Sequence, residues 1–403
     1  NFKIQNGLLL AKTTGKAAIA SLGSRGLYWN NIAIYGDEDN MPRYGFLTAR
    51  TATNGFCDSH NYTNCGTFGY FQSSAFAAYA QESSIYNHCS WWNYYVDGRT
   101  AIYTRSDVDF GAGAFDCDYA TAVTGSHSSI QNKIINVDYR NIPIGRYKIV
   151  LSITNANPAV VTTTKEHEFS NGDYVTFGSE AGMSEISGQR YVIGNVTATT
   201  FELTGIDSTA YGVYSGASIA VVKINKLASV YISSGFNQFS FDNSYIVSYG
   251  SPQIRFAFVD DFATQNMTLD CLFEGHGGNT HIAFTDVDRD LSYKRLINFK
   301  LSIYALKATQ AILTLDAVTA TKLSFENFEG SFGQKHAVIN TYPPLLTLLD
   351  AANVLMHDVD ISLYEDVGMP NATLDAITSK SGKVSFASTQ KVLEFGTPYA
   401  RDI

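Results

Sequence analysis

The chain alternates short apolar runs with clusters of Asn, Asp, Ser and Gly over nearly its whole length. The apolar runs are rich in Val, Ile, Tyr, Phe and Thr, and they show the two-residue period of strands instead of the longer period of helices. Long amphipathic helical patterns are nearly absent. The pattern therefore predicts an all-β protein.

A short motif recurs along the chain, in which Asn, Asp or His is followed by an apolar, a variable and an apolar position. We call the first residue of each motif its anchor. The anchors are Asn31, Asn64, His88, Asp116, Asn136, Asp242, Asp270, Asn298, Asn327 and Asp358. With one exception, neighbouring anchors are 20 to 33 residues apart, as expected for successive coils of a solenoid. We predict a right-handed parallel β-helix, in which each coil adds one strand to each of several parallel sheets.

The first and third positions after each anchor should point inward and stack from coil to coil, about 4.8 Å apart. Four of the five cysteines occupy the first of these positions: Cys65, Cys89, Cys117 and Cys271. We interpret them as small core residues, because the cysteine count is odd and no CxxC spacing suggests a zinc site. We therefore expect no metal and no cofactor.

The exceptional spacing is the 106 residues between Asn136 and Asp242. The excess over an ordinary coil almost equals the length of 145–222, which has short strands and turns of its own and is predicted to be an inserted β module. The expected domains are the N-terminal part of the β-helix (1–144), the module (145–222), the C-terminal part of the β-helix (223–365) and a C-terminal capping segment (366–403).

The inserted module carries landmarks at His167, Gly172-Asp173-Tyr174, Gly182-Met183 and Tyr191. With these residues it resembles a small β domain that recurs in phage tail proteins and is similar to part of the ubiquitin-activating enzyme. Together with the β-helix, it makes the chain resemble a bacteriophage tailspike. The resemblance implies a homotrimer on the virion tail, joined to the tail or baseplate through a missing N-terminal segment. It also implies depolymerisation of a bacterial surface polysaccharide, such as a capsule, an exopolysaccharide or an O-antigen.

Composition narrows the range of partners. Lys and Arg number 28 against 37 Asp and Glu, a net charge of -9 that disfavours nucleic acid. No apolar run approaches the about 18 residues of a membrane span, so membrane insertion is not expected. Aromatic residues reach 13 %, and their ring faces are compatible with sugar binding.

Positions two and four after each anchor should point outward and offer the candidate binding residues. Three aromatic residues, Tyr35, Phe68 and Trp92, fall on successive coils there. We expect them to stack against sugar rings, and we expect Lys300 on a later coil to contact substrate. Tyr245 is at the third position after the anchor Asp242, so it is expected to point inward.

Beyond the aromatic residues, the outward positions carry Asp118, Asp138 and Arg140, and then Glu274. Glycoside hydrolysis needs one protonated carboxyl group and one ionised carboxylate. We expect Asp118 and Asp138, on adjacent coils, to be this pair, with Arg140 orienting them and Glu274 as a reserve acid.

Three alternatives stay open. A rival carboxylate set lies at the end of the second sheet and in earlier corresponding stretches: Asp260, Asp286, Glu82 and Asp107. A polysaccharide lyase would use a basic residue or a Tyr to abstract a proton, with Arg140 and Lys300 neutralising a uronate carboxylate. A receptor-binding tail protein without enzymatic activity would need neither constellation.

Overall fold

The computed structural model describes residues 2–12, 14–15, 17–49, 59–79, 83–96, 98–104, 132–142, 147–178, 182–187, 190–216, 219–223, 227–233, 238–248, 253–258, 264–275, 282–286, 294–308, 313–316, 323–336, 346–348, 353–365, 377–379, 383–386 and 394–395. These residues form strands and one short 3-10 helix, η2 (Ser184–Ile186), and they contain no α-helix. The predicted all-β class is confirmed.

Fifteen strands form one long sheet in which each hydrogen-bonded pair is parallel. They are β1 (Phe2–Ala11), β3 (Leu27–Gly36), β5 (Asn61–Thr63), β6 (Gly66–Gly69), β8 (Ser84–Asn87), β9 (Ser90–Asn93), β11 (Asn132–Ile135), β12 (Asp138–Asn141), β20 (Phe239–Ser248), β22 (Thr264–Gly275), β24 (Lys294–Ala308), β26 (Leu323–His336), β28 (Asn353–Glu365), β30 (Lys383–Phe386) and β31 (Glu394–Phe395).

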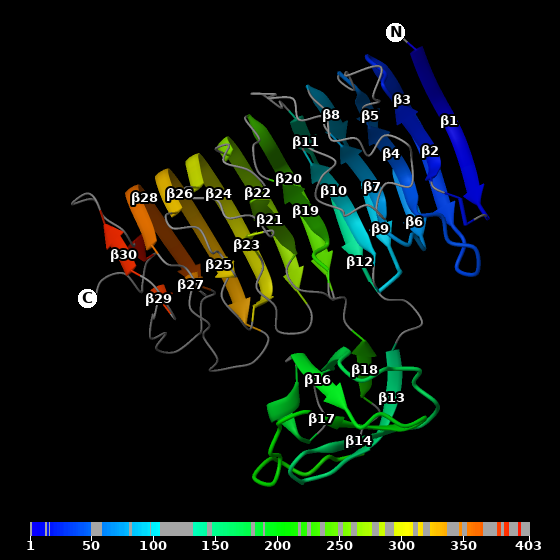
Figure 1. The fold of residues 1–403 in the computed structure, drawn as a ribbon, viewed down its shortest axis with the longest axis vertical. Coiled ribbons are helices and arrows are strands. Elements are labelled where there is room, and N and C mark those ends of the chain that lie inside the picture. The colour runs from blue at the N-terminus through cyan, green and yellow to red at the C-terminus, as the bar shows by residue number, and fades with distance from the viewer. Residues whose placement is uncertain are drawn as a thin grey trace.

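Ten strands form a second parallel sheet. They are β2 (Ala17–Leu22), β4 (Tyr44–Ala49), β7 (Ser74–Tyr79), β10 (Arg99–Thr104), β19 (Val230–Ser233), β21 (Ile254–Phe258), β23 (Ile282–Asp286), β25 (Leu313–Asp316), β27 (Leu346–Leu348) and β29 (Ile377–Ser379). The chain alternates between the two sheets, which we call the paired sheets, and each passage through both is a rung (Figure 1).

A closed six-stranded barrel interrupts the rungs between β12 and β19 and projects from the side of the paired sheets (Figure 1). Its strands are β13 (Tyr147–Ile153), β14 (Val160–Thr163), β15 (Tyr174–Phe177), β16 (Arg190–Gly194), β17 (Thr200–Leu203) and β18 (Ala220–Lys223). The barrel has a separate apolar core, which includes Val161, Phe201 and Val221. β12 pairs directly with β20, so the rungs before and after the barrel are neighbours.

The main core lies between the paired sheets and is rich in stacked aromatic rings. Trp29, Tyr62 and Tyr86 on successive rungs stack nearly parallel, with centroids 6.2 Å and 5.1 Å apart. Fully burying one such ring contributes about 2 to 3 kcal/mol. Cys65, Cys89 and Cys271 are buried and free, as predicted, whereas Cys117 lies outside the described residues.

Four of the anchors make a sharp bend in the chain where it runs through the long sheet. Asn31, Asn64, His88 and Asn136 all have φ between 52° and 56°, in the left-handed region that Asn tolerates better than most residues. The bend places the next residue inward. Ile32, Cys65, Cys89 and Val137 are accordingly buried, each at 4 % exposure or less.

One of the predicted anchors, Asp242, is wrong, and another, Asp116, lies outside the described residues. The backbone N–H of His88 donates directly to the carbonyl of Ile135, so the rung of His88 is next to that of Asn136. On the next rung the left-handed residue is Asn243, with φ of 47°, and not Asp242. This single-residue shift exchanges the two faces of β20.

The later rungs keep the predicted register among themselves. Phe299 pairs with Phe328, which pairs with Val359. Relative to β22, however, β24 is displaced by four residues, because Asp270 pairs with Ser302 instead of with Asn298. The segment that was expected to form a cap contributes β29, β30 and β31, which continue the two sheets.

Candidate functional site

The outer face of the long sheet carries a column of aromatic rings on three successive rungs. Tyr35 on β3 pairs in register with Phe68 on β6, and their rings stack 5.3 Å apart. Phe68 makes an edge-to-face contact with Trp92 on β9, at 5.1 Å. Tyr35 is 46 % exposed, so the column offers ring surface to solvent. The predicted juxtaposition of these three residues is confirmed.

Arg140 on β12 continues this column. Its lateral neighbour on β9 is Trp92, and its guanidinium carbon lies 4.6 Å from the centre of the Trp92 ring. The Nε–H of Arg140 donates to both carboxylate oxygens of Asp138, at 3.0 and 2.9 Å. Residues two apart on a strand share one face, which is why this pair forms. The side chains of Arg140 and Asp138 are 33 % and 24 % exposed.

Two opposing effects act on the Asp138 carboxyl. Its partial burial raises the pKa, and this is the larger effect. The charge and hydrogen bond of Arg140 lower the pKa in part. The indole N–H of Trp92 also lowers it, although that N–H makes no well-formed hydrogen bond among the described residues. The net result is a pKa above the ordinary value for Asp.

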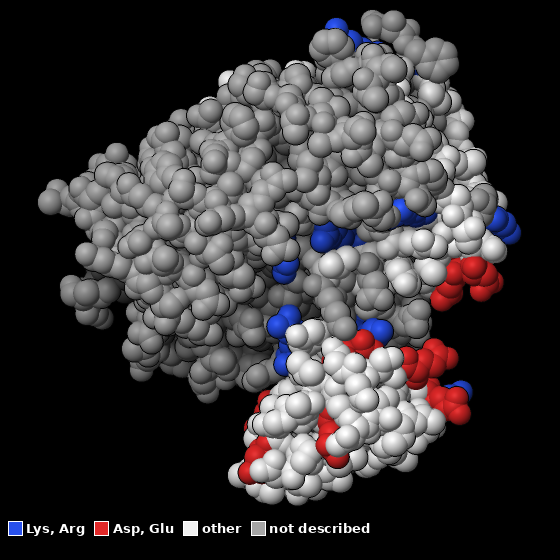
Figure 2. Space-filling model, in the orientation of Figure 1, with Lys and Arg blue, Asp and Glu red and all other residues white. Residues whose placement is uncertain are grey.

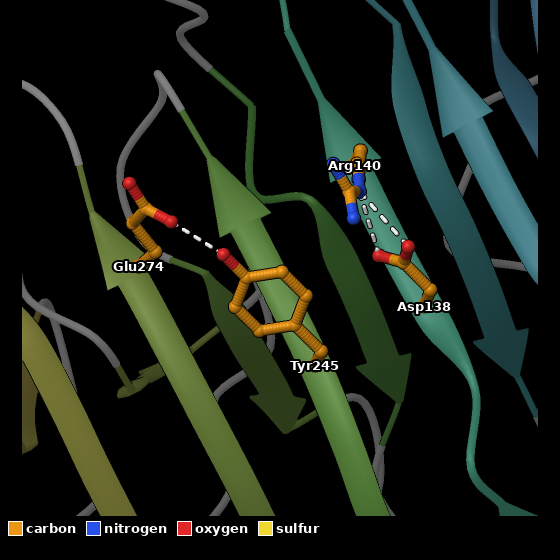
Figure 3. A network of polar contacts seen from close by, with 4 residues as sticks. All are labelled: Asp138, Arg140, Tyr245 and Glu274. Carbon is orange, nitrogen blue, oxygen red and sulfur yellow. Dashed lines mark hydrogen bonds and ion pairs between the residues drawn. The ribbon is translucent and has the colours of Figure 1, made fainter.

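Tyr245 on β20 lies beside Asp138 and reaches toward a second carboxylate. The backbone register pairs Tyr245 with Asp138, and Arg140 lies 5.4 Å from the centre of the Tyr245 ring. The Tyr245 hydroxyl donates a hydrogen bond to Oε2 of Glu274 on β22 (Figure 3). Burial and the Glu274 contact raise the pKa of Tyr245 to about 12, so the hydroxyl keeps its proton at neutral pH. We call Asp138, Arg140, Tyr245 and Glu274 the polar cluster.

The expected neighbours of Asp138 are different in the structure. Both edges of β12 are occupied, by β9 and by β20, so the residues beside Asp138 are Ser90 and Tyr245. Among the described residues, no Asp or Glu therefore lies directly beside Asp138 on a neighbouring strand. Asp118 itself lies outside the described residues. Glu274, predicted as the reserve acid, is instead joined to the cluster through Tyr245.

Lys300 is exposed but distant from Glu274 along the strands. It pairs with Thr268, whereas Glu274 pairs with Leu306. Six residues of β24 separate Lys300 from Leu306, which corresponds to about 20 Å. The four-residue displacement of β24 therefore places Lys300 farther from Glu274 than the predicted register does. The contact of Lys300 with substrate stays a prediction.

The rival carboxylate set is mostly outside the described residues, which do not include Asp260, Glu82 or Asp107. Asp286 ends β23 and pairs with Phe258. On the next rung Asp316 pairs with Thr285 and so is one position out of register with Asp286.

The sequence prediction missed Tyr245 as a site residue. The anchor Asp242 directed Tyr245 into the core, whereas Ile246 is the buried residue, at 0 % exposure. The residue type could have indicated the right anchor. The four other anchors with left-handed geometry are Asn or His, and the Asn on this rung is Asn243.

The described residues hold no group of three or more His, Cys, Asp or Glu side chains that could bind a metal ion. Within the same part of the chain, no helix is long and apolar enough to cross a membrane.

Comparisons with known proteins give one local match and one distant likeness. The family model of the ubiquitin-activating enzyme E1 FCCH domain matches residues 156–221, within the barrel. The solved tailspike protein gp49 from Pseudomonas phage LKA1 is similar over 82 % of this chain and 69 % of its own, with 11 % sequence identity and a TM-score of 0.21. No curated protein matches the chain. A TM-score this low carries no argument about function, and the family match covers too little of the chain to assign it to a family.

Proposed function

We propose that the protein is a bacteriophage tailspike that binds a bacterial surface polysaccharide and cleaves it by hydrolysis. In this proposal the paired sheets are a right-handed parallel β-helix, the barrel is an independent inserted domain, and three copies assemble on the virion tail. The alternation of the chain between two parallel sheets and the small β barrel inserted between two rungs support the proposal. The trimer rests on the tailspike resemblance of the sequence.

The observation that carries the proposal is the continuity of the aromatic column with the polar cluster. Tyr35, Phe68 and Trp92 provide ring surfaces on successive rungs, and ring faces stack well on the C–H surfaces of sugars. The next rungs supply two carboxyl groups and an arginine. The Nη groups of Arg140 make no hydrogen bond to any residue that the structure describes, so they are open to sugar hydroxyls.

Hydrolysis needs one carboxyl group that gives a proton and one that stays ionised. Asp138 is suited to be the general acid because burial raises its pKa. Glu274 is suited to be the general base, since it accepts the Tyr245 hydrogen bond as a carboxylate. Arg140 holds Asp138 in place, and Trp92 would bind the adjacent sugar ring.

The relative positions of the two carboxyl groups favour inversion of configuration. Asp138 and Glu274 are two strands apart and offset by two residues, which separates their Cα atoms by about 12 Å. Tyr245 lies between them (Figure 3). Side chains that converge from this distance fit a carboxyl separation of about 6.5 to 9.5 Å, which leaves room for a water, better than the about 5 Å of retaining enzymes.

Elimination is a weaker alternative at this site. A lyase would use Tyr245 as the base that removes a proton beside the uronate carboxylate. A tyrosine whose pKa is raised to about 12 is rarely ionised at neutral pH. The Arg140 charge is also already paired with Asp138, which reduces its ability to neutralise a substrate carboxylate.

The test incubates the protein with a panel of purified bacterial capsules, exopolysaccharides and O-antigens, and follows chain length by gel filtration and new reducing ends. Hydrolysis predicts shorter chains without an unsaturated product that absorbs in the ultraviolet. Asp138→Asn and Glu274→Gln should each lower turnover by about 10²- to 10⁴-fold. Asp270→Asn, an exposed residue on the same strand as Glu274, is the matched control and should keep full activity.

The same experiment separates the alternatives. Binding without any shortening of a retained polysaccharide would favour the receptor-binding protein without enzymatic activity. An ultraviolet-absorbing product would select the lyase. Full activity in both Asp138→Asn and Glu274→Gln would move the chemistry away from the polar cluster.

A further inference from the structure

The barrel has a pocket of its own, separate from the polar cluster. It has a volume of about 570 Å³ and is lined by Tyr147, Lys148 and Ile149 at the start of β13 and by Thr164, Lys165 and Glu166 after β14. This volume lies in the range of small-molecule sites, about 300 to 1,000 Å³. All six lining residues belong to the barrel, so its interior does not depend on the paired sheets.

The pocket wall is held in place by one backbone hydrogen bond between its two segments and one side-chain hydrogen bond within the second segment. The N–H of Thr164 donates to the carbonyl of Ile149 at 2.9 Å, and the Thr163 hydroxyl donates to the carbonyl of Lys165 at 2.6 Å. The two segments therefore form a preorganised surface, which lowers the ordering cost of binding.

The pocket is basic although the protein as a whole is acidic, with a net charge of -9. Neither Lys148 nor Lys165 makes an ion pair with any residue that the structure describes. Figure 2 shows acidic residues spread over the barrel, with basic and acidic residues together on its side nearest the paired sheets. Burial is the main cause of the lowered pKa of His167, and the charge of Lys148 lowers it as well.

Tyr147 adds a sugar-sized apolar surface to the lining of the same pocket. Its side chain is 56 % exposed, so the ring is accessible from solvent. An aromatic ring offers its face to the C–H surface of a sugar, while ammonium groups make charge-assisted hydrogen bonds to carboxylates. Glu166 provides an acceptor for hydroxyl groups at the same wall.

We propose that this pocket binds a carboxylate-bearing sugar residue of an acidic polysaccharide. Tyr147 stacks on the sugar ring, and Lys148 and Lys165 pair with its carboxylate. The proposal adds a second binding site to the protein, and it holds whether or not the polar cluster hydrolyses the same polymer. If it does, a chain held at the barrel raises the local polymer concentration at the aromatic column, because the barrel is tethered to the paired sheets at both of its ends.

The experiment is affinity electrophoresis of the full chain in native gels that contain polygalacturonate, hyaluronate or neutral dextran. Wild type should be retarded by at least one of the two acidic polymers, less so at high salt, and not by dextran. Tyr147→Ala and the double variant Lys148→Ala with Lys165→Ala should each weaken the retardation by about tenfold or more. Mobilities are compared with those in polymer-free gels, which removes the effect of the changed charge.

The matched control replaces two exposed lysines elsewhere, Lys3→Ala with Lys12→Ala, and should be retarded as wild type. Asp138→Asn should also be retarded as wild type, so that failure of hydrolysis and failure of barrel binding are distinguishable. Absence of retardation by both acidic polymers, or equal retardation of wild type and the pocket variants, would overturn the proposal.

Discussion

Asn243 donates a hydrogen bond from its side-chain Nδ2 to Oδ1 of Asn136 at 2.7 Å, although 107 residues separate the two along the chain. The Nδ2 atom of Asn136 in turn lies 3.4 Å from Nε2 of His88. All three residues have positive φ. A ladder of side-chain hydrogen bonds therefore crosses the point where the barrel is inserted, and it fixes the register of the rungs on either side.

The ladder predicts a specific order of variants at Asn136. Asn136→Val places a β-branched residue in the left-handed region and removes the hydrogen bonds, which should cost about 1 to 3 kcal/mol. Asn136→Gly loses the same hydrogen bonds but tolerates the positive φ. The valine variant should therefore unfold at a lower urea concentration than the glycine variant. Equal midpoints would show that backbone strain at this bend is unimportant.

Inward positions before the barrel could be predicted from the sequence because a two-residue period leaves little freedom once the bend is located. Ile32, Cys65 and Trp91 are buried as expected. The period could not say which of two adjacent polar residues makes the bend, as Asp242 and Asn243 show. It also could not reveal that β8, the strand that ends just before His88, pairs directly with β11.

Removal of the barrel is predicted to leave the paired sheets intact. β10 pairs with β19, and β12 pairs with β20, so the rungs on both sides of the insertion contact each other without it. The equivalent turns, from β6 to β7 and from β9 to β10, are short. A chain lacking 145–222 should be soluble, with an unchanged strand signal per residue by far-ultraviolet circular dichroism. Aggregation of this variant would contradict the prediction.

His167 should make the barrel sensitive to acid. Its Nδ1 accepts a hydrogen bond from the N–H of Phe169 at 3.0 Å, and its Nε2 lies 3.3 Å from the carbonyl oxygen of Thr200. The neutral ring with the proton on Nε2 satisfies both contacts. Burial is the main reason why the pKa is below the ordinary 6.5. The unfolded chain then binds the proton more readily, so stability falls as the pH drops through 6.5 toward the folded pKa.

The measurement compares melting temperatures of wild type and His167→Asn at about pH 7.5 and about pH 5.5, on either side of the ordinary histidine pKa. The melting temperature of wild type should fall more on acidification than that of the variant, which has no titrating ring. His88→Asn is the matched control, since His88 is exposed on the paired sheets, and it should lose as much as wild type. An equal loss in wild type and His167→Asn would contradict the assignment.

The candidate site could be predicted in part, and the limits are geometric. Tyr35, Phe68, Trp92 and Arg140 fall on rungs whose anchors were correctly placed, and they form one column. The connection from Asp138 to Glu274 passes through Tyr245, whose outward direction depends on the bend at Asn243. A contact between residues on different rungs requires every intervening register to be right, so one misplaced anchor was enough to hide it.

Arg140 provides the sharpest test of the acid assigned to Asp138. Its charge and its hydrogen bond both lower the pKa of that carboxyl, against the larger effect of burial. Arg140→Met keeps an apolar stem against Trp92 but removes the charge, so the pKa of Asp138 should rise further. If Asp138 is the general acid, it stays protonated to a higher pH, and the alkaline limb of the pH–rate profile should move upward. If Asp138 were instead the base, the acid limb would move upward.

Carboxyl carbon-13 NMR of Asp138 gives the same answer without substrate, because it reports the titration directly. Arg190→Met is the matched control, since Arg190 stacks on Tyr174 at 4.4 Å in the barrel, outside the polar cluster. It should change neither the Asp138 titration nor the pH–rate profile. A raised Asp138 pKa in Arg140→Met without movement of either limb would exclude Asp138 from proton transfer and leave Glu274 as the only assigned carboxylate of the polar cluster still able to take part.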